Sequence, residues 1–283
     1  MTSNAALQTV RRLFSAAKAG HTGTLDPMAT GLLPLCFGEA TKFSSDLLDA
    51  DKTYEADLLF GIVTDTGDAD GKVIECRDPD FDRSDLEATL QQFKGEIRQI
   101  PPMYSALKVQ GKPLYRLARQ GVEVERKARE VTIHELTLLE SSERTCRLRV
   151  ACSKGTYIRT LAEDIGRTLG CGAHLAGLRR TCVGDLSIEQ AIPLNSLEDC
   201  SEELRNEYLL PPDALLQRLP VIILNEQEAK RFSHGNPVSA TGGQEGKCRV
   251  YGGERLLGVG ERGATGVVSP RRLVANGTCH LKK

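Results

Sequence analysis

Long apolar runs are missing from this chain of 283 residues. No uninterrupted apolar stretch approaches the roughly 20 residues that a membrane-spanning helix requires, and the sequence does not open with a secretory signal peptide. The first residues, MTSNAALQTVRRLF, instead have the spacing of an amphipathic helix. We therefore expect a protein without a membrane partner.

Closely spaced cysteine pairs are missing as well. None of the nine cysteines belongs to a C-x-x-C pair, and their number is odd, so the pattern favours neither a zinc site nor a disulfide framework. Scattered thiols of this kind are typical of the reducing cytoplasm, and we expect the protein to be located there.

One stretch, TDTGDADGKVIE, resembles a calcium-binding loop. Its first and last ligand positions, however, are Thr66 and Arg77, where a hard cation needs carboxylates. We therefore expect no metal, and predict a turn between two strands in which Gly71 adopts the unusual backbone angle.

An excess of either charge is missing from the chain as a whole but not from one segment. The formal net charge is −1, which taken alone argues against a nucleic-acid-binding protein. Residues 101–130 differ, because they hold seven Lys or Arg against three Glu, a net charge of +4. Such a run is commonly a solvated face, but it is also a candidate arm for contacting phosphates.

The spacing of apolar residues predicts a succession of helices and strands. Helices are expected over residues 6–17, 40–48, 113–120 and 158–169, with strands over 32–37, 52–60, 131–139 and 147–152. Ser84 and Glu87 predict a capping box for one further helix. An acidic connector, NSLEDCSEELRNEY, leads to short strands separated by turn glycines. We expect an α+β fold: a mixed, mostly antiparallel sheet flanked by helices in residues 1–214, then a small β-rich domain in residues 215–283.

One carboxylate, Asp26, lies in the stretch GHTGTLDPMATG, where a lone Asp-Pro is commonly a surface turn. The residue before a proline is steered into an extended conformation, and Gly20 and Gly23 allow the preceding backbone to turn. The expected result is a rigid loop that presents a carboxylate able to act as nucleophile or general base. Burial would disfavour the charged form unless a cation lay nearby. The sequence offers three such cations without distinguishing among them: Lys18, Lys42 and Arg159.

Six blocks of sequence, in order, carry a family resemblance. They are GHTGTLDPMATGLLPLCFGEATKF, DKTYEADLLFG, TDTGDADG, IPPMYSALKVQGKPLYRLARQG, SKGTYIRTLAEDIG and GCGAHLAGLRR. Together they resemble the TruB family, the bacterial tRNA pseudouridine synthases that modify uridine 55 in the T loop. The stretches FSHGNPV and VSPRRLV similarly resemble the PUA-type RNA-binding module of this family. The resemblance implies a catalytic domain in residues 1–214, a PUA-like domain in 215–283, the tRNA T arm as partner, no cofactor, and a monomer.

The resemblance also implies how the reaction would be carried out. Asp26 would attack the flipped uridine nucleoside at the anomeric carbon of its sugar, and Arg159 would pair with Asp26 and keep it charged. The uracil would then rotate and reattach through C5. Tyr54 would stack on the target base and move a proton from the sugar, while Tyr157 would close the pocket.

Two further residues and the basic segment complete the implied site. Leu178 would pack against the base, and His21 would help to occupy the space that the base vacates. Taken singly, each residue has an ordinary structural interpretation, and only their joint order supports these roles. The arm at 101–130 would hold the tRNA by its backbone and shape.

The chain departs from the family pattern at its start. Members usually carry a leading strand and a Lys-Pro-x-Gly motif before the first helix, whereas this chain begins at MTSN. If that strand is absent, we expect the sheet to lose an edge partner. Two alternatives remain: a guide-dependent, dyskerin-like pseudouridine synthase and, if the leading strand is absent, an RNA-binding form that does not catalyse.

Overall fold

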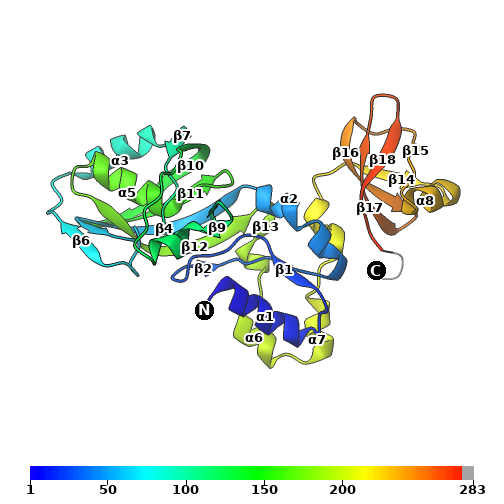
Figure 1. Cartoon of the computed structure of the whole chain (residues 1–283), viewed down its shortest axis with the longest axis horizontal. Coiled ribbons are helices and arrows are strands. Elements are labelled where there is room, and N and C mark those ends of the chain that lie inside the picture. The colour runs from blue at the N-terminus through cyan, green and yellow to red at the C-terminus, as the bar shows by residue number, and fades with distance from the viewer. Residues whose placement is uncertain (276–283) are drawn as a thin grey trace.

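A seven-stranded sheet forms the centre of the computed structural model, which describes residues 1–275 (Figure 1). Its strands in spatial order are β13 (Leu186–Ser187), β12 (Ala173–Val183), β4 (Lys52–Phe60), β11 (Thr145–Cys152), β10 (Arg129–Ser141) and β7 (Gly95–Gln99), with β2 (Thr30–Gly31) beside β12. All neighbours are antiparallel except β12 and β2. The predicted α+β class with a mixed, mostly antiparallel sheet is therefore confirmed.

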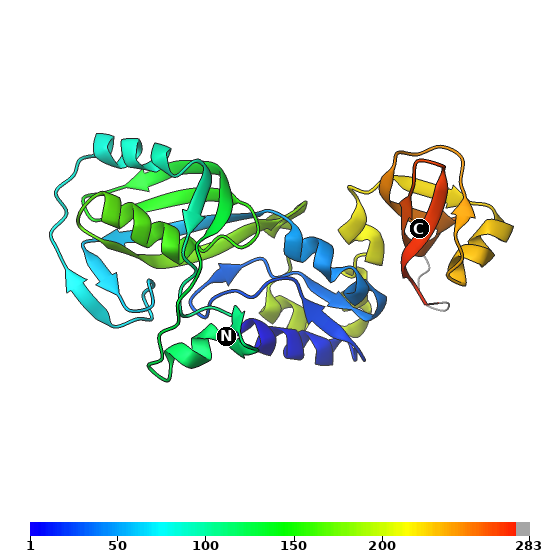
Figure 2. The same ribbon diagram turned by 45° about the horizontal axis from the view of Figure 1, so that its top comes forward.

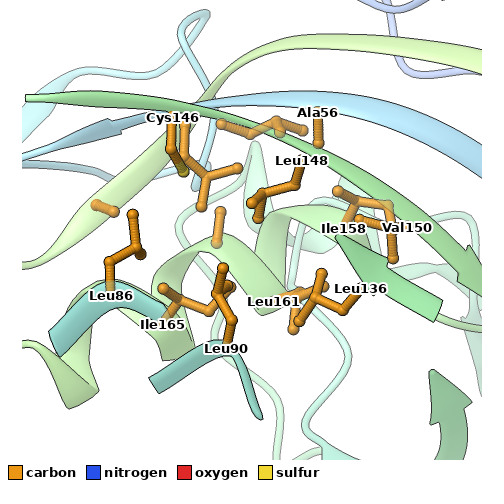
Figure 3. Packing of buried hydrophobic residues seen from close by; sticks show 14 of the residues in the cluster. Ala56, Leu86, Leu90, Leu136, Cys146, Leu148, Val150, Ile158, Leu161 and Ile165 are labelled. Atoms are coloured by element: carbon orange, nitrogen blue, oxygen red, sulfur yellow. The ribbon is translucent and has the colours of Figure 1, made fainter. Parts of the chain in front are cut away.

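The main core lies between one face of this sheet and two helices, α3 (Arg83–Gln92) and α5 (Ile158–Thr168). Leu86 and Leu90 of α3 and Leu161 of α5 point toward the strands (Figure 3). Alternate residues of β4 complete the layer, and Phe60 is fully buried there. Apolar area removed from water in this way contributes roughly 25 cal/mol per Å². Because α5 is packed against the sheet, the side chains at the start of this helix are held in fixed positions.

The N-terminal part surrounds the end of the sheet. Its elements are α1 (Ser3–Leu13), β1 (Ala19–His21), β3 (Leu35–Phe37), the 3₁₀ helix η1 (Gly38–Lys42) and α2 (Ser44–Asp49). The helix expected over 40–48 is therefore divided. The break allows Phe43, which is 1 % exposed, to pack against the C-terminal part of the chain. The strand expected over 32–37 is also shorter, because Pro34 has no N–H to donate and pairing begins only at Leu35.

Two local predictions differ from the structure. The capping box of α3 is made by Asp82 and Asp85, not by Ser84 and Glu87, since Asp caps a helix as well as Ser does and lies two residues earlier. The turn between β5 (Ile62–Thr64) and β6 (Val73–Cys76) takes its positive φ, +72°, at Gly67. Gly71 is required for space instead, because a Cβ there would lie 2.3 Å from the Thr66 hydroxyl.

The C-terminal part forms a separate five-stranded sheet with its own core, and lies at one end of the molecule (Figures 1 and 2). The connector holds α6 (Leu194–Asp199), α7 (Glu202–Glu207) and η3 (Pro212–Leu216), and the sheet holds β14 (Val221–Leu224), β16 (Gly246–Gly252), β17 (Arg255–Arg262), β18 (Val267–Leu273) and β15 (Val238–Ser239), with α8 (Glu226–Ser233) against them. Phe43, Leu216 and Tyr251 share one buried cluster, which joins this sheet to the N-terminal part. None of the helices in residues 1–275 is long and apolar enough to cross a bilayer.

Candidate active site

The loop that carries Asp26 is anchored on both sides of the carboxylate. The Leu25 N–H donates to the Ser3 hydroxyl of α1 at 2.8 Å, and the Ala29 N–H donates to the Asp26 carbonyl at 2.9 Å. Gly23 has the expected positive φ of +101°, whereas Gly20 lies in β1 without one. The loop is therefore held in place, and the Asp26 side chain is 34 % exposed.

Arg159 pairs with this carboxylate through two parallel hydrogen bonds. Its Nε lies 3.0 Å from Asp26 Oδ2, and its Nη2 lies 3.2 Å from Oδ1. The guanidinium is 5 % exposed and also donates to the carbonyls of Thr66 and Tyr104, at 3.0 and 2.7 Å. A forked guanidinium fits a carboxylate better than an ammonium does, and two such bonds also fix its direction.

The other two candidate cations lie elsewhere. Lys42 donates to Glu39 at 2.7 Å and to the carbonyl of Leu273 at 2.9 Å, so it serves the junction with the C-terminal sheet. Lys18 is exposed at the end of the segment before β1. Of the three, only Arg159 contacts Asp26.

Asp68 is a second carboxylate beside Arg159, and the sequence analysis did not single it out. Its Oδ2 lies 3.5 Å from Arg159 Nε, and the residue is 5 % exposed. Its other oxygen accepts from the Thr66 hydroxyl at 2.6 Å. One buried guanidinium thus faces two carboxylates, of which only Asp26 is open to solvent. The TDTGDADG stretch, which the sequence analysis gave as a turn and as one of the six family blocks, was the signal that could have pointed to Asp68.

Two tyrosines approach the site from different elements. Tyr54 comes from β4, where burial raises its pKa to about 12, and Tyr157 precedes α5, where burial also raises the pKa. The Asp26 charge acts on both phenols in the same direction, which places them within its field. Both phenols are therefore protonated near neutral pH and able to donate.

The backbone of Tyr157 is held by a buried glutamine. The Gln99 side chain accepts from the Tyr157 N–H at 3.0 Å and donates to the Tyr157 carbonyl at 3.2 Å. Gln99 is 2 % exposed, at the end of β7. These two contacts fix the start of α5 and therefore the position of Arg159 in its first turn.

Leu178 and His21 lie at the margin of this group. Leu178 of β12 is 9 % exposed in the main core, against which Ala29 and Tyr54 pack. His21 of β1 has a pKa lowered by burial and by the charge of Arg180. Its imidazole is therefore neutral near pH 7. Within residues 1–275, neither side chain is hydrogen-bonded to Asp26, whereas Arg159 is, and both phenols lie within the field of the Asp26 carboxylate.

The basic segment at 101–130 extends from the site as an arm. It contains β8 (Lys108–Val109), β9 (Lys112–Pro113) and α4 (Leu114–Ala118). Arg126 is half-buried and donates to the Pro101 carbonyl at 3.1 Å, which closes the base of the arm. The remaining cations are exposed: Lys108, Lys112, Arg116, Arg119, Lys127 and Arg129. In residues 1–275, no group of His, Cys, Asp and Glu side chains is arranged to hold a metal ion.

Comparison with known proteins gives matches across the chain. Residues 11–158 match the model of the TruB family pseudouridylate synthase N-terminal domain. Residues 159–217 match the tRNA pseudouridylate synthase B C-terminal domain, and residues 220–274 match the pseudouridine synthase II TruB C-terminal model.

Individual relatives agree with these models. The chain is 61 % identical over 274 residues to a tRNA pseudouridine synthase B of Dechloromonas aromatica, covering 97 % of this chain and 92 % of that protein. It is 55 % identical over 278 residues to the protein of that name from Azoarcus sp. strain BH72, covering 98 % and 92 %. Among solved structures, one of a Cbf5-Nop10-Gar1 complex matches with a TM-score of 0.71 and 26 % identity, over 94 % of this chain and 76 % of that one. A similar fold occurs in an H/ACA RNP bound to a substrate RNA, with a TM-score of 0.73 and 24 % identity, over 96 % and 81 %.

Proposed function

The chain belongs to the TruB family of pseudouridine synthases, and from this premise we propose that it isomerises uridine 55 in the T loop of tRNA to pseudouridine. The relatives at 53–61 % identity carry the name tRNA pseudouridine synthase B. The observation that carries the proposal is the Asp26 carboxylate, held by two hydrogen bonds from Arg159 and open to solvent on its remaining side.

The chemistry starts from that charged carboxylate. One Asp26 oxygen attacks the anomeric carbon of the sugar, and the glycosidic bond to N1 breaks, leaving the electron pair on uracil. The uracil rotates, C5 bonds to the anomeric carbon as the Asp26 oxygen leaves, and the C5 proton is lost while N1 regains one. Product and substrate have the same atoms, so no oxidant, reductant or phosphate donor is consumed, and the proposal includes no cofactor.

The neighbouring side chains have supporting roles in this proposal. Tyr54 stacks on the base and exchanges a proton with the sugar, and Tyr157 closes the pocket. Leu178 packs against the base, and His21 helps to fill the space that the base leaves. Extruding a base costs roughly a few kcal/mol, which aromatic stacking of about 1–3 kcal/mol per base offsets in large part.

The exposed arm at 101–130 and the C-terminal sheet hold the RNA in this proposal. Six exposed cations on the arm suit phosphates, and the C-terminal sheet acts as the PUA-like module. A monomer in the cytoplasm suffices, because every proposed site residue comes from one chain and the substrate is tRNA.

A guide-dependent enzyme is the competing proposal, since the similar solved folds include Cbf5 in complexes with other proteins. The identity to the synthase B relatives is more than twice that to Cbf5, which favours the enzyme that acts alone.

The test uses the purified chain and an unmodified tRNA transcript, with no guide RNA. We expect pseudouridine at position 55 only, and none when that uridine is replaced by cytidine. No product without a guide would favour the competing proposal, and product at another uridine would contradict the assigned position. Normal RNA binding without any product, either with or without a guide RNA, would identify a non-catalytic form.

A further inference from the structure

Arg180 is a buried guanidinium beside the site that none of the roles above uses. It lies on β12, is 1 % exposed, and is the largest fully buried side chain in residues 1–275. Its Nε donates to the Leu32 carbonyl at 2.8 Å, and its Nη2 donates to the Gly23 carbonyl at 3.2 Å. The Tyr54 hydroxyl lies beside the same guanidinium, and each of the two groups shifts the pKa of the other.

The surroundings of Arg180 do not balance its charge. Within residues 1–275 no carboxylate forms an ion pair with it, and burial lowers its pKa. A buried charge without an opposite charge is costly to folding. A neutral side chain of similar volume would avoid that cost. The position therefore has a reason beyond packing.

The two carbonyls that Arg180 contacts are the two ends of the Asp26 loop. The contact at Gly23 precedes Asp26, and the contact at Leu32 follows it. The backbone of Arg180 adds a bond, since its carbonyl accepts from the Leu32 N–H at 2.8 Å. Gly31 permits this close approach, because a Cβ there would lie 2.2 Å from the Arg180 carbonyl oxygen.

We propose that Arg180 is a positioning residue for the isomerisation: its guanidinium holds both ends of the Asp26 loop and, beside the Tyr54 hydroxyl, keeps the loop and that tyrosine in one arrangement. Asp26 and the Tyr54 ring then meet the same nucleotide from fixed directions. This inference rests on the proposed function, which makes Asp26 the nucleophile and Tyr54 the stacking residue. A lysine cannot replace the fork, because it directs a single ammonium rather than a planar set of donors.

Because Arg180 is buried, its replacement should change the reaction rate rather than the affinity for RNA. A side chain that is 1 % exposed does not reach an RNA bound at the surface, so its replacement leaves the Kd for tRNA within about threefold. A misplacement of about 1 Å at the reacting groups lowers the rate about 100-fold. We therefore expect a loss in the single-turnover rate and not in binding.

The experiment compares Arg180→Met and Arg180→Lys with Arg179→Met, an exposed arginine on the same strand. The substrate is saturating tRNA tritiated at uridine C5. Arg180→Met releases tritium about 100-fold more slowly than the unaltered protein, and Arg180→Lys at least 10-fold more slowly. The rate of the Arg179→Met control stays within threefold of the unaltered rate. Both Arg180 variants are repeated in a Tyr54→Phe background. In that background, the fold-decrease in tritium release that each Arg180 substitution causes is at least threefold smaller than when Tyr54 is present, because part of the coupling between the two residues is already gone.

Each outcome decides the inference. Full activity of either Arg180 variant, equal losses in both Tyr54 backgrounds, or a tenfold weaker Kd would overturn it. If Arg180→Met does not fold by circular dichroism, the Arg180→Lys series decides alone. Asp26→Asn is assayed in parallel with the unaltered chain. No tritium release by the unaltered chain removes the proposed function, an active Asp26→Asn removes the nucleophilic role of Asp26, and an inactive Asp26→Asn with an active Arg180→Met removes only the positioning role.

Discussion

Replacing Arg159 tests how much the ion pair with Asp26 contributes to the site. The guanidinium donates four hydrogen bonds, two to the Asp26 carboxylate and one each to the carbonyls of Thr66 and Tyr104. Arg159→Met removes all four and leaves Asp68, at 5 % exposure, without the cation that faces it. Arg159→Lys keeps a charge but loses the fork.

The magnitudes follow from burial. Removing one partner of a buried ion pair costs about 3–5 kcal/mol, so Arg159→Met should lower the free energy of unfolding by that amount. This is a large part of the free energy of unfolding of a typical domain, which is roughly 5–15 kcal/mol. Arg159→Lys should lower the single-turnover rate about 100-fold, because the carboxylate loses its fixed direction. Arg159→Met should lower it at least as much.

The assay is tritium release from uridine C5 in a T-arm transcript under single-turnover conditions, with urea unfolding as the measure of stability. Arg167→Met is the matched control, since Arg167 lies on the same helix with its side chain 75 % exposed and paired with Asp164. The control should keep its rate and stability. A folded Arg159→Met that releases tritium at more than a tenth of the normal rate would refute the reasoning.

Three further predictions concern residues around the pair. Asp68→Asn should slow single-turnover tritium release about tenfold, because the guanidinium loses its second carboxylate; an unchanged rate would show that Asp68 does not orient it. Gln99→Leu leaves the Tyr157 N–H unsatisfied, while the Tyr157 carbonyl still accepts from the Leu161 N–H at 3.1 Å. It should therefore lower the free energy of urea unfolding by about 1–3 kcal/mol and slow the reaction. Equal stability of Gln99→Leu and the unaltered chain would contradict this. The pKa of His21 is lowered in the folded protein, so the unfolded chain takes up a proton first as pH falls below about 6.5, and stability is lost there. His21→Gln should thus lose less stability between pH 7 and 5 in urea titrations, and an identical loss would contradict the sign.

Short-range patterns predicted the elements that carry the site. The apolar spacing of α5 and the strand–helix junction before it put Tyr157 and Arg159 at the start of a packed helix, as the structure has them. The Asp-Pro sequence likewise predicted a held loop at Asp26. These features depend on residues close together in the chain, which periodicity and turn chemistry describe well.

Contacts between distant segments could not be predicted in this way. Choosing Arg159 over Lys42 requires knowing that Lys42 faces the C-terminal sheet. Asp68, Gln99 and Arg180 reach the site from three segments far apart in the sequence, and apolar spacing and turn chemistry do not report that these segments meet. The capping box failed for a simpler reason: two overlapping acid and hydroxyl patterns compete at the start of α3, and the earlier one forms.

The most direct test of the account is the rate of Asp26→Asn on a T-arm transcript that carries tritium at C5 of its uridines. Asparagine keeps the size of the side chain but has no negative oxygen to attack the sugar. We expect binding of the transcript to persist and tritium release to fall to the background of a reaction without enzyme. Turnover well above that background would contradict the role of Asp26.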